Sequence, residues 1–136
     1  MSKNLAFGND ILSKTFNNIE FAWLPLSGFY LSLHTDNPGA SGNQMTNECN
    51  YGGYTRVLTL RNTDNWLVAG NRVENNTTVV YPTCMSGKNV AKYFAIGTNM
   101  NGIGRIIYSG ALTSTLTITL NVQPRFSKGS IVVLET

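Results

Sequence analysis

The stretch YFAIGTNMNGIGRIIYSGAL, residues 93–112, decides the fold class. Two runs rich in aromatic and β-branched residues, 90–97 and 105–111, flank a turn at residues 98–104. The turn holds Asn-Gly and a second glycine two positions later, and these residues tolerate the positive φ that tight hairpin turns require. Half-buried strands favour the residue types of the flanking runs. We therefore predict a central β hairpin.

Outward from this hairpin, short runs typical of strands recur with turn signals between them. Residues 29–35, FYLSLHT, alternate apolar and polar side chains, which predicts a strand with one buried face. Further strands are expected at residues 54–61, 66–69, 72–73, 77–81, 116–122 and 130–135.

One stretch, residues 9–18, has helical spacing of its apolar side chains, with Asn9 or Asp10 as the expected cap. A helix of two to three turns is marginal alone, so Ile11, Leu12 and Phe16 must dock on its own sandwich or on another subunit.

The predicted fold is all-β: an antiparallel, jelly-roll-like β sandwich of about eight strands with one short N-terminal helix. We expect an N-terminal helix and arm at residues 1–26 and a single β-sandwich domain at 27–136. The arm contains FAWLPL, residues 21–26, which we expect to cover one end of the core more readily than to bind a partner.

Composition excludes several classes of protein. Charged residues make up 12% of the chain, and its 10 basic and 7 acidic residues are scattered, which argues against nucleic-acid binding. No apolar run approaches the roughly 18 residues of a membrane span, and the first residues lack the pattern of a signal peptide. Cys49 and Cys84 stand alone, so we expect two reduced thiols in a chain made in a cytoplasm.

No pattern indicates catalysis, a metal site or a cofactor site. His34 is the one histidine, and a Ser-His or Cys-His pair would need it, with Asp36 as orienter. A polar histidine at a strand end is expected at the surface. The acidic residues are single, without the carboxylate pair of a glycosidase or the ligand spacing of a metal site. The Gly102–Gly104 loop has neither the helix nor the lysine of a phosphate loop. We predict no enzyme.

Carbohydrate binding stays open, because β sandwiches can bind sugars through exposed aromatic side chains. Aromatic residues in strands are more often part of the core or of cross-strand pairs. The aromatic residues available for this role are Trp23, Trp66, Tyr51, Tyr54, Tyr81 and Tyr108.

Three segments together resemble a family of small structural proteins of tailed bacteriophages. They are residues 30–57, with LHTDNPG and GYTRV, residues 66–82, and residues 94–112, with IGTNMNGIGRIIYSGAL. The ending shares the family pattern at Pro124, Phe126, Gly129 and Val133, so the resemblance covers nearly the whole chain. Members are often labelled tail fibre protein, and some are capsid cement, or decoration, proteins of jelly-roll type. The FAWLPL segment and the cysteines depart from the family pattern.

The resemblance implies a capsid cement protein that binds the outside of the head and stabilises the shell by mass action. Its partner would be the major capsid protein of the same virion, its free form a homo-oligomer (dimer or trimer), and its location the capsid surface after synthesis in the host bacterial cytoplasm. The alternative is a tail or fibre-associated module that binds host surface glycans. We expect partner contacts in the N-terminal arm, the loop 36–51 and the hairpin tip. The candidates are Phe21, Trp23, Leu24, Asp36, Asn37, Gln44, Asn99 and Asn101.

Overall fold

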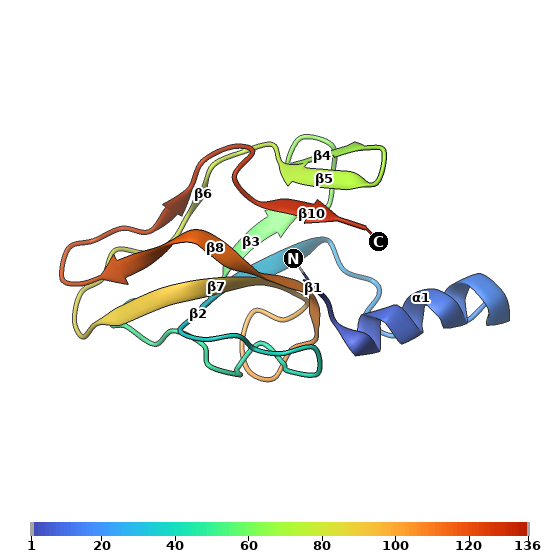
Figure 1. Ribbon diagram of the computed structural model, residues 1–136, viewed down its shortest axis with the longest axis horizontal. Helices are drawn as coiled ribbons and strands as arrows, with labels where there is room; N and C mark the ends of the chain where they lie inside the picture. The colour runs from blue at the N-terminus through green and yellow to red at the C-terminus, as the bar shows by residue number, and fades with distance from the viewer. Residues whose placement is uncertain (1, 136) are drawn as a thin grey trace.

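The computed structural model describes residues 2–135, which form antiparallel β-sheets and one helix (Figure 1). The largest sheet has five strands in the order β1-β8-β7-β2-β3. Their bounds are β1 Ser2–Lys3, β2 Gly28–His34, β3 Val57–Leu60, β7 Asn89–Gly97 and β8 Ile106–Ile118. The structure confirms the predicted all-β class, an open antiparallel sandwich with one short helix.

Two smaller sheets lie over the five-stranded sheet (Figure 1). One has three strands in the order β10-β5-β4, and the other pairs β6 with β9. Their bounds are β4 Trp66–Ala69, β5 Arg72–Asn75, β6 Val79–Val80, β9 Arg125–Phe126 and β10 Val132–Leu134. The core fills the space between the layers, where Leu31, Leu33, Tyr81, Ile118 and Ile131 are almost fully buried.

The central hairpin is confirmed as β7 and β8, and β7 lies in the middle of the largest sheet. The separate strand expected at 116–122 is wrong. Residues 116–118 continue β8 and pair with 89–91, beyond an irregularity between Ala91 and Tyr93. A bulge of this kind bends a strand without ending its pairing, so one long strand replaces two.

Strand β4 has the expected bounds and β5 extends two residues beyond them, but three other strands are shorter than the sequence pattern predicts. The stretches expected at 54–61, 77–81 and 130–135 contain β3, β6 and β10, each of two to four residues. The two-residue strands β1 and β9 were not predicted, because two residues carry no periodicity.

The helix α1 (Leu5–Asn17) begins four residues before the predicted start. Its cap is Asn4, not Asn9 or Asp10: the Asn4 side chain accepts a hydrogen bond from the Ala6 backbone N–H at 2.9 Å. The Asn4 backbone N–H also donates to the carbonyl of Ile107 at 3.0 Å, so the cap is tied to β8. From this anchor α1 projects away from the sheets (Figure 1).

The hairpin tip is held by one buried glutamine. The Gln44 side-chain oxygen accepts from the Asn99 N–H at 2.9 Å, and the Gln44 backbone N–H donates to the Gly104 carbonyl at 3.0 Å. A Cβ atom would lie 2.2 Å from the Gln44 side chain at Gly97 and 1.7 Å from it at Gly104. Only glycine permits this close approach at either position.

We expect Gly104→Ala to destabilise the protein by about 1–3 kcal/mol, because the new methyl group must displace the Gln44 side chain. Urea unfolding would measure the loss. The matched control is Gly8→Ala in α1, where a Cβ meets no described atom within 4 Å. Alanine there should be neutral or stabilise by up to about 1 kcal/mol. Equal effects of the two substitutions would contradict the packing argument.

Candidate functional site

An aromatic cleft of about 560 Å³ opens between the five-stranded sheet and the three-stranded sheet. We call it the aromatic cleft. Its lining is mainly apolar, and its wall is built from α1, the arm, β2, β4 and β8. The large side chains that line it are Phe7, Phe21, Trp23, Phe29, Trp66 and Tyr108.

The arm between α1 and β2 folds back onto its own chain to form one side of the cleft. Phe21 stacks on Trp23, with ring centroids 4.9 Å apart and an interplanar angle of 16°. Phe7, at the base of α1, contacts the Tyr108 ring edge-on at 5.4 Å. Phe7 is the buried residue of α1, and this aromatic cluster therefore fixes the base of the helix to the sheet.

Two hydrogen-bond donors in the cleft are unsatisfied. Within residues 2–135, the indole Nε1 atoms of Trp23 and Trp66 are buried without a hydrogen-bond partner. An unpaired buried donor costs about 1–3 kcal/mol. The side chains of the cleft wall therefore include two indole N–H groups that lower the stability of the isolated chain.

The rim of the cleft is basic. The Arg61 guanidinium lies 5.4 Å from the ring centroids of both Trp23 and Phe29, a cation–π arrangement that keeps it at the mouth. Arg72 also lines the cleft and pairs at 3.2 Å with Glu74.

Within residues 2–135, the carboxylate that lines the cleft belongs to Glu135 and is already engaged. Glu135 accepts from Lys3 and from the Tyr108 hydroxyl. These hydrogen bonds, that of Lys3 first, lower the pKa of the Glu135 carboxyl. Burial raises the pKa of Tyr108, and its bond to Glu135 raises it further. The carboxylate is therefore charged at neutral pH but compensated by Lys3, which leaves the rim with a positive character.

The helix α1 exposes its apolar stripe to solvent. Leu5, Leu12 and Phe16 share one face, at spacings of seven and four residues, and are 67%, 58% and 78% exposed. The opposite face carries Phe7 in the cluster and Asp10, which binds Arg105 of the sheet domain. Of the two docking surfaces expected for Leu12 and Phe16, the chain's own sandwich is excluded, and another subunit stays a prediction. The face of α1 that carries Phe7 and Asp10 is held against the sheets by their contacts. The opposite face, with the apolar stripe, therefore points to solvent.

The other expected contact residues gather at a second surface, where the loop after β2 meets the hairpin tip. Asp36 and Asn37 are exposed in the loop, and Asn99 and Asn101 are exposed at the tip.

Gln44 is fully buried, so its side chain is unavailable to a partner, which corrects the expectation that it is a contact. The arm residues Phe21, Trp23 and Leu24 are half-buried, in the part of the chain that borders the aromatic cleft. The structure thus divides the candidates between two surfaces.

The second surface is clamped by a buried ion pair. Arg56 binds both carboxylate oxygens of Glu48, at 2.7 and 2.9 Å, and donates to the carbonyls of Asn99 and Gly102 at 3.0 and 2.7 Å. Tyr54 donates to Glu48 at 2.7 Å. Bidentate, charge-assisted bonds of this kind have defined geometry as well as strength, so the loop and the tip form one rigid unit.

His34 is fully buried, which overturns its predicted surface position. The residues around 43–48 cover the second face of β2. The His34 Nδ1–H donates to the Thr46 carbonyl at 2.7 Å, and Nε2 accepts from the Ser32 hydroxyl at 2.8 Å. This Ser-His pair resembles a nucleophile and its base, but both residues are 0% exposed, so no substrate reaches them. Burial lowers the pKa of His34 and keeps it neutral.

The cysteines are buried and free within the described chain, in agreement with the expected reduced thiols. Burial raises the pKa of Cys49 to about 12, so its reactive thiolate is scarce at neutral pH. Among residues 2–135, no three His, Cys, Asp or Glu side chains gather as a metal site would need. None of the helices in this range is both long and apolar enough to cross a bilayer.

Of the aromatic residues considered for sugar binding, Tyr51 and Tyr81 are buried, and Tyr54 packs against the core. Trp23, Trp66 and Tyr108 line the aromatic cleft. Sequence reasoning missed Phe7 and Arg61 as parts of this cleft. The sequence did carry a signal for Phe7. Leu5 and Leu12 are seven residues apart and share one face of the helix, which places Phe7 on the opposite face.

Comparison with known proteins identifies one family. A family model described as podophage GP4 fiber I protein gp80 matches residues 1–134, nearly the full length. None of the curated proteins matches the chain.

The buried histidine predicts a pH dependence. The pKa of His34 is lowered on folding, so the unfolded chain takes up a proton below its ordinary pKa of about 6.5 while the folded chain does not. The free energy of unfolding should therefore fall as the pH drops below about 6.5, by at most about 1.4 kcal/mol per pH unit. Urea unfolding between neutral pH and about pH 5 measures this slope, above the range where carboxylates titrate. The His34→Gln variant should show a flatter dependence, and an identical slope would contradict the assignment.

The ion pair of the second surface predicts a contrast between two arginines. Arg56→Ala leaves the largely buried Glu48 without its counter-charge, with the Tyr54 hydroxyl still donating to it, and should cost about 3 kcal/mol of stability in urea unfolding. Arg72→Ala breaks a pair whose arginine side chain is 45% exposed, and should cost less than about 1 kcal/mol. Similar losses for the two variants would show that the clamp contributes little.

Proposed function

We infer that this chain, which belongs to the family of the podophage GP4 fiber I protein gp80, serves at the tail of a bacteriophage virion as a subunit of a fibre or of its attachment. Its class is that of a phage fibre-type structural protein. The observation that carries the proposal is the family match over residues 1–134, which includes both the projecting helix and the β domain.

The geometry supports a structural role. The chain offers two surfaces suited to contact with neighbours: the apolar stripe of α1 and the rigid unit of loop and hairpin tip. The tip presents Met100 and Ile103, 59% and 73% exposed, on a backbone held by Arg56 and Gln44. Exposed apolar side chains on a rigid support are typical of protein–protein contacts. The Ser-His pair, in contrast, is sealed inside the core.

The capsid cement role stays a prediction, together with the major capsid protein as partner. It rests on the sequence resemblance, and the family description names a fibre protein. We therefore favour a location at the tail of the virion over one on the capsid. A cement protein would use the same two surfaces to bridge shell subunits, so only its location in the virion distinguishes the two roles.

Binding of host surface glycans also stays a prediction. Trp23, Trp66 and Tyr108 could stack on a sugar, and Arg61 could donate to its hydroxyl groups. The cleft lining is mainly apolar, however, and a sugar needs hydrogen-bonding groups across its width. An apolar occupant suits this lining better.

Imaging of purified virions tests the location. Virions labelled with an antibody fragment against this protein and imaged by cryo-EM should carry the label at the tail. Label spread over the head would overturn the fibre proposal and favour the cement role. Virions assembled without the protein are the control and should bind no fragment.

A further inference from the structure

The apolar stripe of α1 is the feature that the fold leaves least explained. Leu5, Leu12 and Phe16 point to solvent, and Ile19, just past the helix end, is 56% exposed. Amphipathic helices normally turn the apolar face toward a core. Here the contacts of Phe7 and Asp10 hold the stripe outward, so its partner must come from outside the described chain.

The same chain carries a surface of matching chemistry, the aromatic cleft. Its lining is mainly apolar, and its rim includes Val68, which is 69% exposed on β4. A cleft of this kind gains most from an apolar occupant of side-chain size.

The charges of the two surfaces are complementary. The outer end of α1 is its C-terminus, which carries the negative end of the helix dipole, and Glu20 follows it. Lys14 of the last turn is already paired with Glu20 at 2.7 Å. The cleft rim presents Arg61, which has no carboxylate partner within residues 2–135, whereas Arg72 is paired with Glu74. Glu20 is the charged residue at the end of the stripe, whose neighbours on the helix surface, Gly8, Asn9, Ser13 and Thr15, are uncharged.

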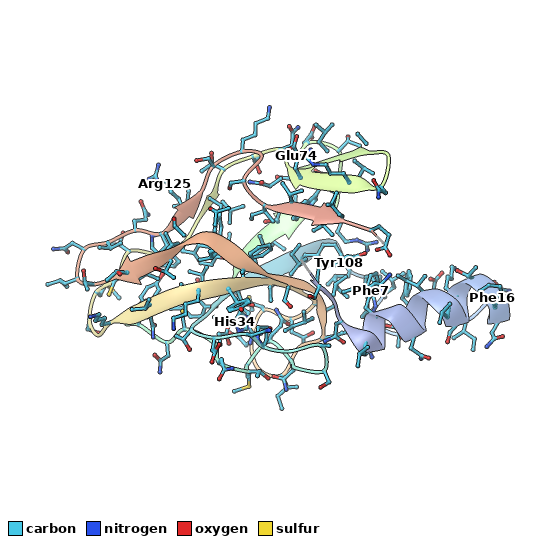
Figure 2. The ribbon with its side chains drawn as sticks, in the orientation of Figure 1. Phe7, Phe16, His34, Glu74, Tyr108 and Arg125 are labelled. Atoms are coloured by element: carbon cyan, nitrogen blue, oxygen red, sulfur yellow. The ribbon has the colours of Figure 1, made fainter. Side chains whose placement is uncertain are left out.

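A chain cannot fill the cleft with its own stripe. Phe7, at the base of α1, belongs to the cleft wall, while Phe16 is nine residues further along the helix, about 14 Å away at 1.5 Å per residue. Figure 2 shows Phe7 beside Tyr108 and Phe16 at the far end of α1. Only a second molecule can bring these two surfaces together.

We propose that the apolar stripe of α1, with Leu12, Phe16 and Ile19, packs into the aromatic cleft of a second copy of this chain. Every copy then donates one helix and accepts one, as closed symmetry requires. A stable interface buries roughly 800 Å² on each partner. One short apolar stripe buries less area than this. In a reciprocal pair, each copy buries two surfaces, its own stripe and its own cleft. The inference does not rest on the tail location, since a head protein would assemble the same way.

Sedimentation velocity of the full chain, with three single substitutions, tests the contact. The wild type should sediment as a dimer or larger ring. Phe16→Asp removes the donor and Val68→Asp removes the acceptor, so each variant alone should sediment as a monomer. Leu120→Asp is the matched control: its side chain is 62% exposed, in the turn after β8, and lies in neither the stripe nor the cleft, so the variant should keep the wild-type assembly.

The decisive arm mixes the two defective variants. Phe16→Asp retains an intact cleft and Val68→Asp an intact helix, so an equimolar mixture restores one of the two contacts. It should associate more weakly than the wild type but measurably more strongly than either variant alone. Far-UV circular dichroism spectra should match the wild type, because both positions are exposed, while the melting temperature should fall by the stabilisation that assembly contributes.

Several results would overturn the proposal. One is a wild type that stays monomeric over the whole concentration range. Another is a Val68→Asp variant that still associates while Phe16→Asp does not, which would indicate helix–helix pairing. Dissociation caused by the Leu120→Asp control, or a mixture that associates no more strongly than either variant alone at any concentration, would also exclude the contact. If the wild type is monomeric and added sugar shields Trp66 from a fluorescence quencher, the cleft binds a glycan instead.

Discussion

The bidentate pair of Arg56 and Glu48 is the interaction on which the layout of this molecule depends. Glu48 lies where the backbone of its loop pairs with the end of β2, and Arg56 immediately precedes β3. The same guanidinium reaches two carbonyls of the hairpin tip. One buried charge pair thus joins a loop, two strand ends and the central hairpin. Because an uncompensated buried charge is costly, the loop must close over β2, and that closure also buries His34 and Gln44.

The opposite end of the molecule is organised by aromatic packing instead of charge. Phe7, Phe21 and Trp23 fix the start of α1 against Tyr108, and this choice of anchor decides the direction of the helix and of its apolar stripe. The end that carries the aromatic cleft also carries the helix. A fold that leaves both a large apolar stripe and an apolar cleft at its surface is suited to assembly, in line with its membership of a family of fibre proteins.

The sequence predicted the fold more fully than it predicted the surfaces. The hairpin, the strand β2 and the all-β class follow from alternation and turn chemistry, which act over a few residues. The length of β8 did not follow, because the irregularity between Ala91 and Tyr93 is decided by pairing across strands. The contact candidates were chosen as exposed loop and arm residues. The structure leaves Asp36, Asn37, Asn99 and Asn101 exposed but buries Gln44, whose polar side chain is satisfied by backbone groups distant in the chain.

By itself, the sequence determined that this protein is a small all-β domain with a central hairpin, an N-terminal helix and no recognisable chemistry. Those features depend on local periodicity, on glycine and asparagine in turns, and on residue counts. Only the tertiary structure decided which face of α1 is exposed, where the aromatic arm lies, and that Ser32 and His34 form a sealed pair. These outcomes depend on which distant segments meet. A side chain such as Phe16 or His34 has the same local pattern whether it is covered or exposed, and contacts across the fold settle which state it takes.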